Sequence, residues 1–145
     1  MMATLAPLIF HSPKLGDVSY SREDVLRFPQ GLPGFEPLRD FLLVTREECE
    51  PFVFLASLEQ PDVALPLIPL ALAAARLQAR AESPAPPSGG AEGALTYYAV
   101  VSIGVQASEV IVNLRAPVVV NLDTRLGCQV ILPDETLPVS ARLGA

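Results

Sequence analysis

The sequence has few of the residues from which common catalytic and metal sites are built. It has no tryptophan, and His11 and Lys14 are its only histidine and its only lysine. Cys49 and Cys128 lie far apart and form neither a CxxC motif nor a Cys/His cluster, which argues against a zinc or thiol-redox site. We interpret both cysteines as small hydrophobic residues, and a disulfide between them is the alternative.

The familiar catalytic motifs are also missing. The chain has no GxxxxGK[ST] phosphate loop and no GxGxxG, HExxH or GxSxG motif. An enzyme centred on His11 is one alternative, but no partner motif surrounds this residue. Neighbouring acids such as Glu23 and Asp24 do not by themselves converge across a cleft. The sequence therefore predicts no enzyme and no catalytic, metal or cofactor-binding residue.

Long hydrophobic runs and positive charge are scarce. The longest apolar run, residues 63–75, is too short to span a bilayer and contains Pro66 and Pro69. Residues 1–10 have no basic residue ahead of their apolar stretch, unlike a signal peptide. The net charge of −6 would repel phosphate groups, so we expect a soluble, cytoplasmic protein without direct nucleic-acid or membrane binding. A basic protein partner fits this charge better.

Proline and hydrophobic residues are plentiful. The chain of 145 residues has 15 prolines and nine glycines, half of its residues are hydrophobic, and its mean hydropathy is +0.39. Such a chain can form a core but not long helices. Its apolar segments are short, rich in β-branched residues and bounded by turn residues. We therefore predict an all-β, small antiparallel β-barrel-like single domain over residues 1–145, with one or two short helices.

The expected elements follow from these patterns. A hairpin is predicted over residues 7–20, and a short helical turn that Ser21 and Asp24 cap is predicted to run to Arg27. A short helix is predicted at residues 70–82, and the low-complexity stretch 83–93 (SPAPPSGGAEG) is predicted to be a flexible loop inside the domain. Strands are predicted at residues 41–45, 52–58, 62–69, 95–106, 110–114, 118–122 and 129–132.

Three local features are candidates for function. The segment FPQGLPGFE at residues 28–36 predicts a rigid loop, either a tight connection that buried Phe28 and Phe35 anchor or a loop that faces a partner. The acidic stretch at residues 47–50 is typical of a solvated turn and could also attract a basic partner. The motif NLRAPVVVN at residues 113–121 predicts a turn between two strands, with each asparagine side chain bonding nearby backbone.

Three segments together resemble one known family. FPQGLPGFE at residues 28–36, PFVFLASLEQPDVALPLIP at 51–69 and VNLRAPVVVNLDTRLGCQVIL at 112–132 resemble the FliW family of flagellar assembly factors. The resemblance implies a small β-barrel-like domain without catalytic activity. It also implies two partners, flagellin, bound through its C-terminal region before export, and the translational repressor CsrA. Flagellin export would free the factor to bind the repressor, which would relieve repression of flagellin mRNA translation.

We assign residues to this expected role in two groups. The residues expected to contact a partner are Leu32, Pro33, Phe35, Glu36, Glu47, Glu48 and Glu50. The residues expected to define the fold are Phe28, Gly31, Gly34, Asn113, Leu114, Pro117 and Asn121.

The chain also departs from the family. Residues 70–93 lack the aromatic and acidic residues that the family usually carries there, so a partner contact in this segment would be altered. We expect a monomer. The alternative function is a small β-barrel that binds an apolar small molecule, which would require an open cavity.

Overall fold

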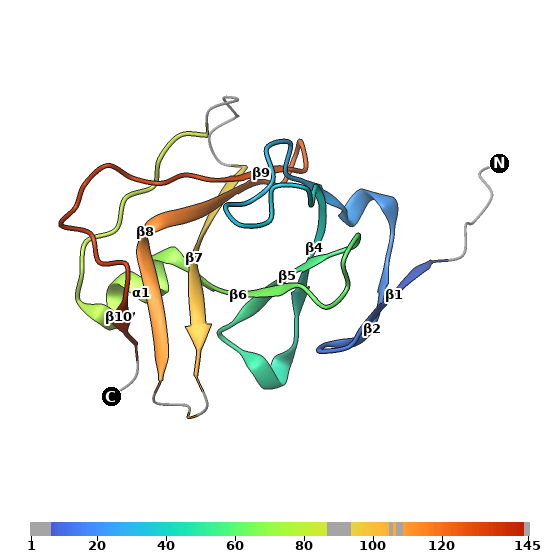
Figure 1. Ribbon diagram of the computed structural model, residues 1–145, viewed down its shortest axis with the longest axis horizontal. Helices are drawn as coiled ribbons and strands as arrows, with labels where there is room; N and C mark the ends of the chain where they lie inside the picture. The colour runs from blue at the N-terminus through green and yellow to red at the C-terminus, as the bar shows by residue number, and fades with distance from the viewer. Residues whose placement is uncertain (1–6, 87–93, 105, 107–108, 144–145) are drawn as a thin grey trace.

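A computed structural model describes residues 7–86, 94–104, 106 and 109–143 (Figure 1). Within this part of the chain, strands dominate and α1 (Leu70–Leu77) is an eight-residue α-helix. Two short 3-10 turns are η1 (Arg22–Asp24) and η2 (Glu47–Cys49). The strands are β1 (Leu8–Ser12), β2 (Gly16–Tyr20), β3 (Leu26–Arg27), β4 (Asp40–Thr45), β5 (Val53–Ser57), β6 (Ala64–Pro69), β7 (Leu95–Ile103), β8 (Val110–Asn121), β9 (Leu126–Gln129) and β10 (Ala141–Arg142).

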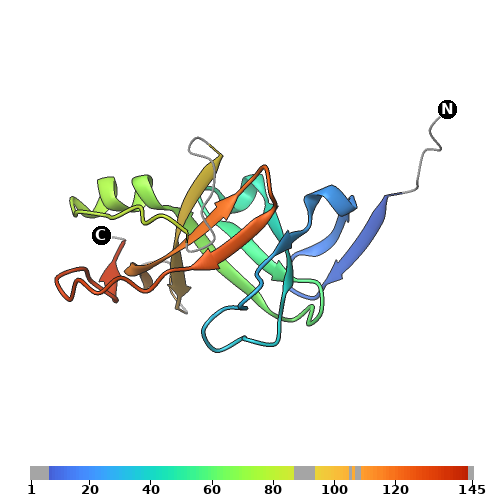
Figure 2. The same ribbon diagram turned by 90° about the horizontal axis from the view of Figure 1, so that it is seen from above.

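The main sheet closes on itself. Its strands follow the order β10-β8-β7-β6-β5-β4-β3-β9, and β9 also pairs with β8, so that β3 to β9 form a ring (Figures 1 and 2). This confirms the predicted all-β barrel. All pairings in the ring are antiparallel except that of β3 with β9, where Arg27 pairs in parallel with Leu126. The predicted antiparallel barrel therefore contains one parallel junction, a single residue pair.

Alternating side chains of the strands divide the core between the inside and the outside of the barrel. On β4, Phe41 and Leu43 belong to the central cluster, whereas Leu42 and Val44 pack on the other face. The alternation follows from the two-residue repeat of a strand. Buried members of the central cluster are Leu26, Phe28, Leu32, Leu38, Phe41, Leu55, Val63, Leu67, Tyr98, Val118 and Val120.

Two local elements cover the outer face of the barrel. Helix α1 buries Leu70 and Ala73 against β6, β7 and β8, and the hairpin β1–β2 buries Phe10 against β4 and β5. The predicted hairpin and short helix are therefore both confirmed. Figures 1 and 2 show the hairpin and the helix on opposite sides of the barrel.

The predicted turn within NLRAPVVVN is wrong, because β8 is a single strand through residues 110–121. It does bend. Val100 pairs with Asn113 and Tyr98 pairs with Val118, so Ala99 alone on β7 lies opposite residues 114–117 on β8. This large bulge, with four residues of β8 opposite one residue of β7, lets β8 leave the edge of β7 and pair with it again further along. The bulge turns the strand around the barrel.

The motif residues satisfy the backbone at this bend. The Oδ1 atom of Asn113 accepts the N–H of Arg115 at 2.8 Å, while the N–H of Leu114 donates to the carbonyl of Pro138 at 2.9 Å. Pro117 has no N–H that would need a partner. The prediction that the asparagine side chains bond nearby backbone is confirmed, because Asn121 also accepts the N–H of Asp123 at 2.9 Å.

Other predicted boundaries shift for identifiable reasons. The turn after Ser21 ends at Asp24, because the next residues join the barrel as β3. Helix α1 ends at Leu77, where Gln78 takes a left-handed conformation with φ of 51°. Strand β9 covers residues 126–129 rather than the predicted 129–132, since the chain pairs with β8 as soon as it leaves the turn after Asn121. Of the predicted flexible loop at 83–93, residues 87–93 lie outside the described residues.

Close contact between Phe28 and Gly127 packs the barrel where β3 meets β9. Phe28 is fully buried, and its ring meets that of Phe41 edge to face, with centroids 5.1 Å apart. A Cβ atom at Gly127 would lie 2.5 Å from Cζ of Phe28. Glycine is therefore required at position 127 because an aromatic side chain fills the space beside it.

We predict that Gly127→Ala lowers the free energy of unfolding by about 2 kcal/mol through overpacking. Urea denaturation should show that this cost falls below about 1 kcal/mol in a Phe28→Leu background, which makes room for the methyl group. In the matched Phe41→Leu background the cost should persist. Equal costs in the two backgrounds would contradict the proposed clash.

A charged cluster fastens the chain after β9 to the chain after α1. The guanidinium of Arg80 pairs with the carboxylates of Asp134 and Glu82. Asp134 also accepts the hydroxyl of Thr136 at 2.6 Å and the backbone N–H of Thr136 at 2.9 Å. Hydrogen bonds from Thr136, and to a smaller extent the guanidinium of Arg80, lower the pKa of Asp134 to about 2.

The low pKa of Asp134 predicts a specific loss of stability in acid. Because the folded chain favours the ionised carboxylate, the contribution is complete above the unfolded value near pH 4 and is lost as the pH falls towards about 2. Thermal unfolding followed by circular dichroism between pH 5 and pH 2.5 should be less pH-dependent for Asp134→Asn. Thr136→Val should reduce the dependence in part, whereas curves parallel to the wild type for both variants would refute the assignment.

Candidate functional site

The loop between β3 and β4 has a fixed shape. The N–H of Gly31 donates to the carbonyl of Phe28 at 2.8 Å, and the N–H of Phe35 donates to that of Leu32 at 2.7 Å. Gly31 and Gly34 have φ of 68° and 87°, in the left-handed region. At Gly31 a Cβ atom would also lie 2.4 Å from the carbonyl oxygen of Glu36, so that only glycine fits.

The residues expected to contact a partner differ in their exposure. Leu32 is buried in the central core, so it offers little surface to a partner. Pro33, Gly34 and Glu36 are exposed, and Phe35 is half-buried against the core. The carboxylate of Glu36 accepts the N–H of Gly34 at 3.0 Å, and backbone donors at Glu36 itself and at Gly34 lower its pKa.

This loop meets the bent part of β8 at a pocket of about 430 Å³, here called the loop–strand pocket. Two motifs far apart in the sequence, FPQGLPGFE and NLRAP, therefore contribute to one surface. Leu65 and Val100, which pack against the central core, connect the pocket to the barrel interior. The full lining is Leu32, Pro33, Phe35, Leu65, Val100, Asn113, Arg115, Ala116, Gln129, Ile131 and Val139.

The polar side chains of the loop–strand pocket are held in place by backbone. The Nε atom of Arg115 donates to the carbonyl of Leu132 at 3.3 Å. The Nε2 atom of Gln129 donates to the carbonyl of Ala116 at 2.9 Å. With Asn113 bonded to the strand, the pocket presents a mainly apolar wall with a few oriented polar groups, which is the usual composition of a binding site.

Sequence reasoning does not find most of these residues, among them Arg115, Gln129, Ile131 and Val139. Arg115 and Gln129 look like ordinary polar residues of a strand, and only the folding of the chain after β9 against β8 brings them to the pocket. Val139 does carry a signal, because it is a large apolar residue in a short proline-containing stretch, whereas Ile131 looks like a member of the predicted strand at 129–132. The side chains of Ile131 and Val139 remain 67% and 52% exposed.

The acidic turn lies at the other end of β4 from this loop (Figure 1). Glu47 and Glu48 belong to η2, and the N–H of Glu50 donates to the carbonyl of Glu47 at 3.2 Å. All three acids are exposed. Because β4 has six residues, the acidic turn and the loop are roughly 20 Å apart along the strand. The residues expected to bind partners therefore form two separate surfaces.

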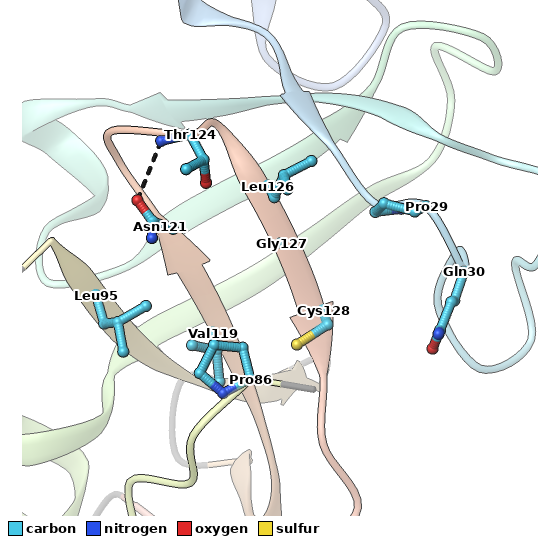
Figure 3. Close-up of a pocket in the computed structure, with 10 residues that line it drawn as sticks. All are labelled: Pro29, Gln30, Pro86, Leu95, Val119, Asn121, Thr124, Leu126, Gly127 and Cys128. Atoms are coloured by element: carbon cyan, nitrogen blue, oxygen red, sulfur yellow. Dashed lines mark hydrogen bonds between the residues drawn. The ribbon is translucent and has the colours of Figure 1, made fainter. Parts of the chain in front are cut away.

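A second pocket of about 100 Å³ lies between β7, β8 and β9 (Figure 3). It contains Asn121, whose Oδ1 atom accepts the N–H of Thr124 at 3.1 Å, and Cys128, whose pKa burial raises. The raised pKa favours the unreactive thiol form of Cys128. Asn121 therefore shapes the turn after β8 and lies apart from the loop–strand pocket.

His11 lies away from these surfaces, on the hairpin. Its Nδ1 atom and Oδ1 of Asp17 are 2.7 Å apart, with the two side chains 75% and 70% exposed. Among the described residues, no three His, Cys, Asp or Glu side chains are grouped so that they could hold a metal ion. In the same part of the chain, no helix has the length and apolar character to cross a membrane.

Known proteins resemble this chain over nearly its full length. The sequence model of the family described as FliW protein matches residues 9–143. A flagellar assembly factor FliW of Carboxydothermus hydrogenoformans is 34% identical over 130 residues, which cover 88% of this chain and 84% of that protein. One of Thermotoga petrophila is 37% identical over 136 residues, 86% of each chain.

A solved structure supports the same relationship. The crystal structure of a flagellar assembly factor FliW matches this fold with a TM-score of 0.82 and 26% sequence identity. The match covers 94% of this chain and 97% of the other. The extent of these matches, with the closed barrel and the loop and bend motifs in place, leads to one conclusion: the chain belongs to the FliW family of flagellar assembly factors.

Proposed function

We propose that this protein is a non-enzymatic flagellar assembly factor that acts by binding proteins in the cytoplasm. As a monomer, it binds the C-terminal region of flagellin. When it is free of flagellin, it binds the translational repressor CsrA and relieves repression of flagellin mRNA translation. Family membership supports this role, and the two separate surfaces described above provide places for two protein partners.

The loop–strand pocket is the observation that carries the proposal for flagellin. Its apolar wall combines the rigid loop at Leu32, Pro33 and Phe35 with the bend of β8. Exposed Ile131 and Val139 extend the apolar surface beyond the pocket, and such patches mark protein-binding sites. A flagellin segment that is unfolded before export could bury its apolar side chains there.

The acidic turn supports the proposal for the repressor. A protein that binds RNA needs a basic surface, and the net charge of −6 is unsuited to RNA itself. Glu47, Glu48 and Glu50 are exposed together on a turn that their backbone hydrogen bonds hold in shape. Complementary charge would steer the two proteins together and raise their association rate.

The atypical segment after β6 supports the fold in this chain. Leu70 and Ala73 of α1 are buried against the barrel, whereas Ala71, Ala75 and Arg76 are exposed. The exposed side of the helix therefore offers methyl groups and one cation. A contact that relatives make through this segment would be altered in this protein, so we assign partner binding to the other two surfaces.

An apolar small molecule is the second candidate ligand, and the loop–strand pocket is the observation that favours it. The barrel interior is filled by side chains of the central cluster, so a ligand would bind at the surface pocket rather than inside the barrel. A titration with hydrophobic fluorophores would test this candidate directly. Saturable binding that flagellin does not displace would favour it.

The main experiment is a competition between the two protein partners. Isothermal titration of the purified chain with monomeric flagellin, and separately with the repressor, should show saturable binding to each. Pre-bound flagellin should then reduce capture of the repressor, because surfaces roughly 20 Å apart leave little room for two proteins at once. Excess free chain should restore translation of a flagellin mRNA reporter that the repressor has silenced. Absence of binding to both proteins at low salt would refute the proposed function.

We predict that reversing the charge of the acidic turn slows capture of the repressor. The triple variant Glu47→Lys, Glu48→Lys and Glu50→Lys should lower the association rate constant about tenfold at low salt, because attraction becomes repulsion. Stopped-flow fluorescence should show the difference shrinking as salt increases. Binding of flagellin should change little.

A matched control separates local charge from net charge. Glu23→Lys, Asp62→Lys and Asp123→Lys alter three exposed acids elsewhere and give the same change in net charge. This control should retain most of the association rate. If both triple variants slow the reaction equally, the acidic turn is not the specific contact.

A further inference from the structure

The loop–strand pocket of this acidic protein has one positively charged side chain, Arg115, in its mainly apolar wall. Arg115 lies within the bend of β8, and its side chain is only 28% exposed. Its Nε atom donates to the carbonyl of Leu132 at 3.3 Å, which holds the guanidinium beside the pocket. A guanidinium fixed by backbone is prepared to bind a carboxylate with little loss of side-chain freedom.

The acid of this chain that lies beside Arg115 is a weak partner for it. The Oε1 atom of Glu135 is 4.0 Å from Nη2 of Arg115, beyond hydrogen-bond distance, and the Glu135 side chain is 87% exposed. A pair at this distance, with one carboxylate almost fully in solvent, contributes little energy. A carboxylate brought by a ligand could therefore replace Glu135 at small cost.

Exposed apolar side chains of the chain after β9 lie close to Arg115 and line the same pocket. The carbonyl of Arg115 accepts the N–H of Leu132, next to Ile131, whereas the N–H of Leu114 donates to the carbonyl of Pro138, next to Val139. Leu132 continues from β9 and Pro138 leads into β10, and both strands pair with the edge of β8 that faces away from β7, so Ile131 and Val139 lie along one edge of β8. The pocket therefore combines a cation with apolar side chains from this part of the chain and from the loop at Pro33 and Phe35.

We propose that the loop–strand pocket binds a peptide segment in which an acidic side chain is flanked by apolar residues, and that Arg115 selects the acidic residue. The inference rests on the proposed function, in which flagellin supplies such a segment. Apolar side chains around Arg115, contributed by the loop and by the chain after β9, fit an acidic residue within a chain better than a terminal carboxylate. A second copy of this protein is a poor occupant, because the net charge of −6 on each copy opposes self-association.

The test begins with monomeric flagellin and full-length variants of this protein. Arg115→Gln, which removes the charge, should weaken flagellin binding about tenfold in isothermal titration. Arg115→Lys should retain part of the affinity and its salt dependence, because the charge remains. Glu135→Gln should bind as tightly as the wild type or more tightly, since it removes the competing carboxylate.

One further variant tests the apolar surface of the pocket, and another serves as the control. Val139→Ser, at an exposed position, should weaken binding about threefold through lost apolar contact. Arg22→Gln removes an exposed arginine on η1 and should leave binding unchanged. The melting temperature of each variant shows whether the fold is retained, and Arg115→Lys and Val139→Ser keep the test valid if Arg115→Gln unfolds.

Peptides then identify the acidic residue. Ten-residue peptides that tile the flagellin sequence are titrated against the wild-type chain, and each aspartate or glutamate of the binding peptide is changed to its amide. One such change should weaken binding to the wild type about tenfold and have no further effect on Arg115→Gln. Additive effects of the two changes would overturn the proposed pairing, and binding that requires a free terminal carboxylate would overturn the choice of an internal acid.

The outcomes separate this inference from the proposed function. If flagellin fails to bind the wild-type chain, the proposed function fails and the inference fails with it. If flagellin binds the wild type but Arg115→Gln, Arg115→Lys and Val139→Ser bind equally well, the pocket assignment fails while the proposed function stands. Loss of binding in the pocket variants with retention in Arg22→Gln supports both.

Discussion

Closure of the barrel depends on the bend in β8. This strand pairs with β7 on one side and with β9 and β10 on the other, so it joins the two ends of the sheet. A straight strand could not follow the curved wall of the barrel, and the large bulge at residues 114–117 changes the direction of the strand. The bend removes backbone groups from the pairing with β7. The Asn113 side chain and the chain after β9 form hydrogen bonds with some of these groups, and Pro117 has no N–H that needs a partner. The motif NLRAP is therefore a requirement of closure.

The bend also creates the candidate binding surface. Because β8 swings away from β7 there, the rigid loop after Phe28 and the chain after β9 come to line one pocket with it. The loop keeps its shape through Gly31, whose φ of 68° and contact with Glu36 exclude a side chain. Fold-defining and partner-facing residues are thus interleaved, since the same segments that close the barrel also form the pocket.

Local sequence predicts most strands of this fold but not their long-range arrangement. Alternation on β4 and the polar turn in the hairpin act within a few residues, so the sequence shows them directly. Asn113 and Pro117 resemble turn residues for the same local reason, yet they lie inside a strand, because what decides is pairing with residues far along the chain. The burial of Leu32 is likewise not visible in the local sequence, because distant strands supply the core around it.

The same distinction explains why the acidic turn is easier to find than the pocket. Glu47, Glu48 and Glu50 are neighbours in sequence and remain neighbours on the surface, so composition alone reveals their charge. The role of Arg115 becomes visible only when the fold brings Ile131 and Val139, from the chain after β9, into the same pocket. A protein with a net charge of −6 can then still hold one well-placed cation for an acidic segment. Net charge governs which classes of partner approach, whereas the placement of single charges governs which segment of a partner binds.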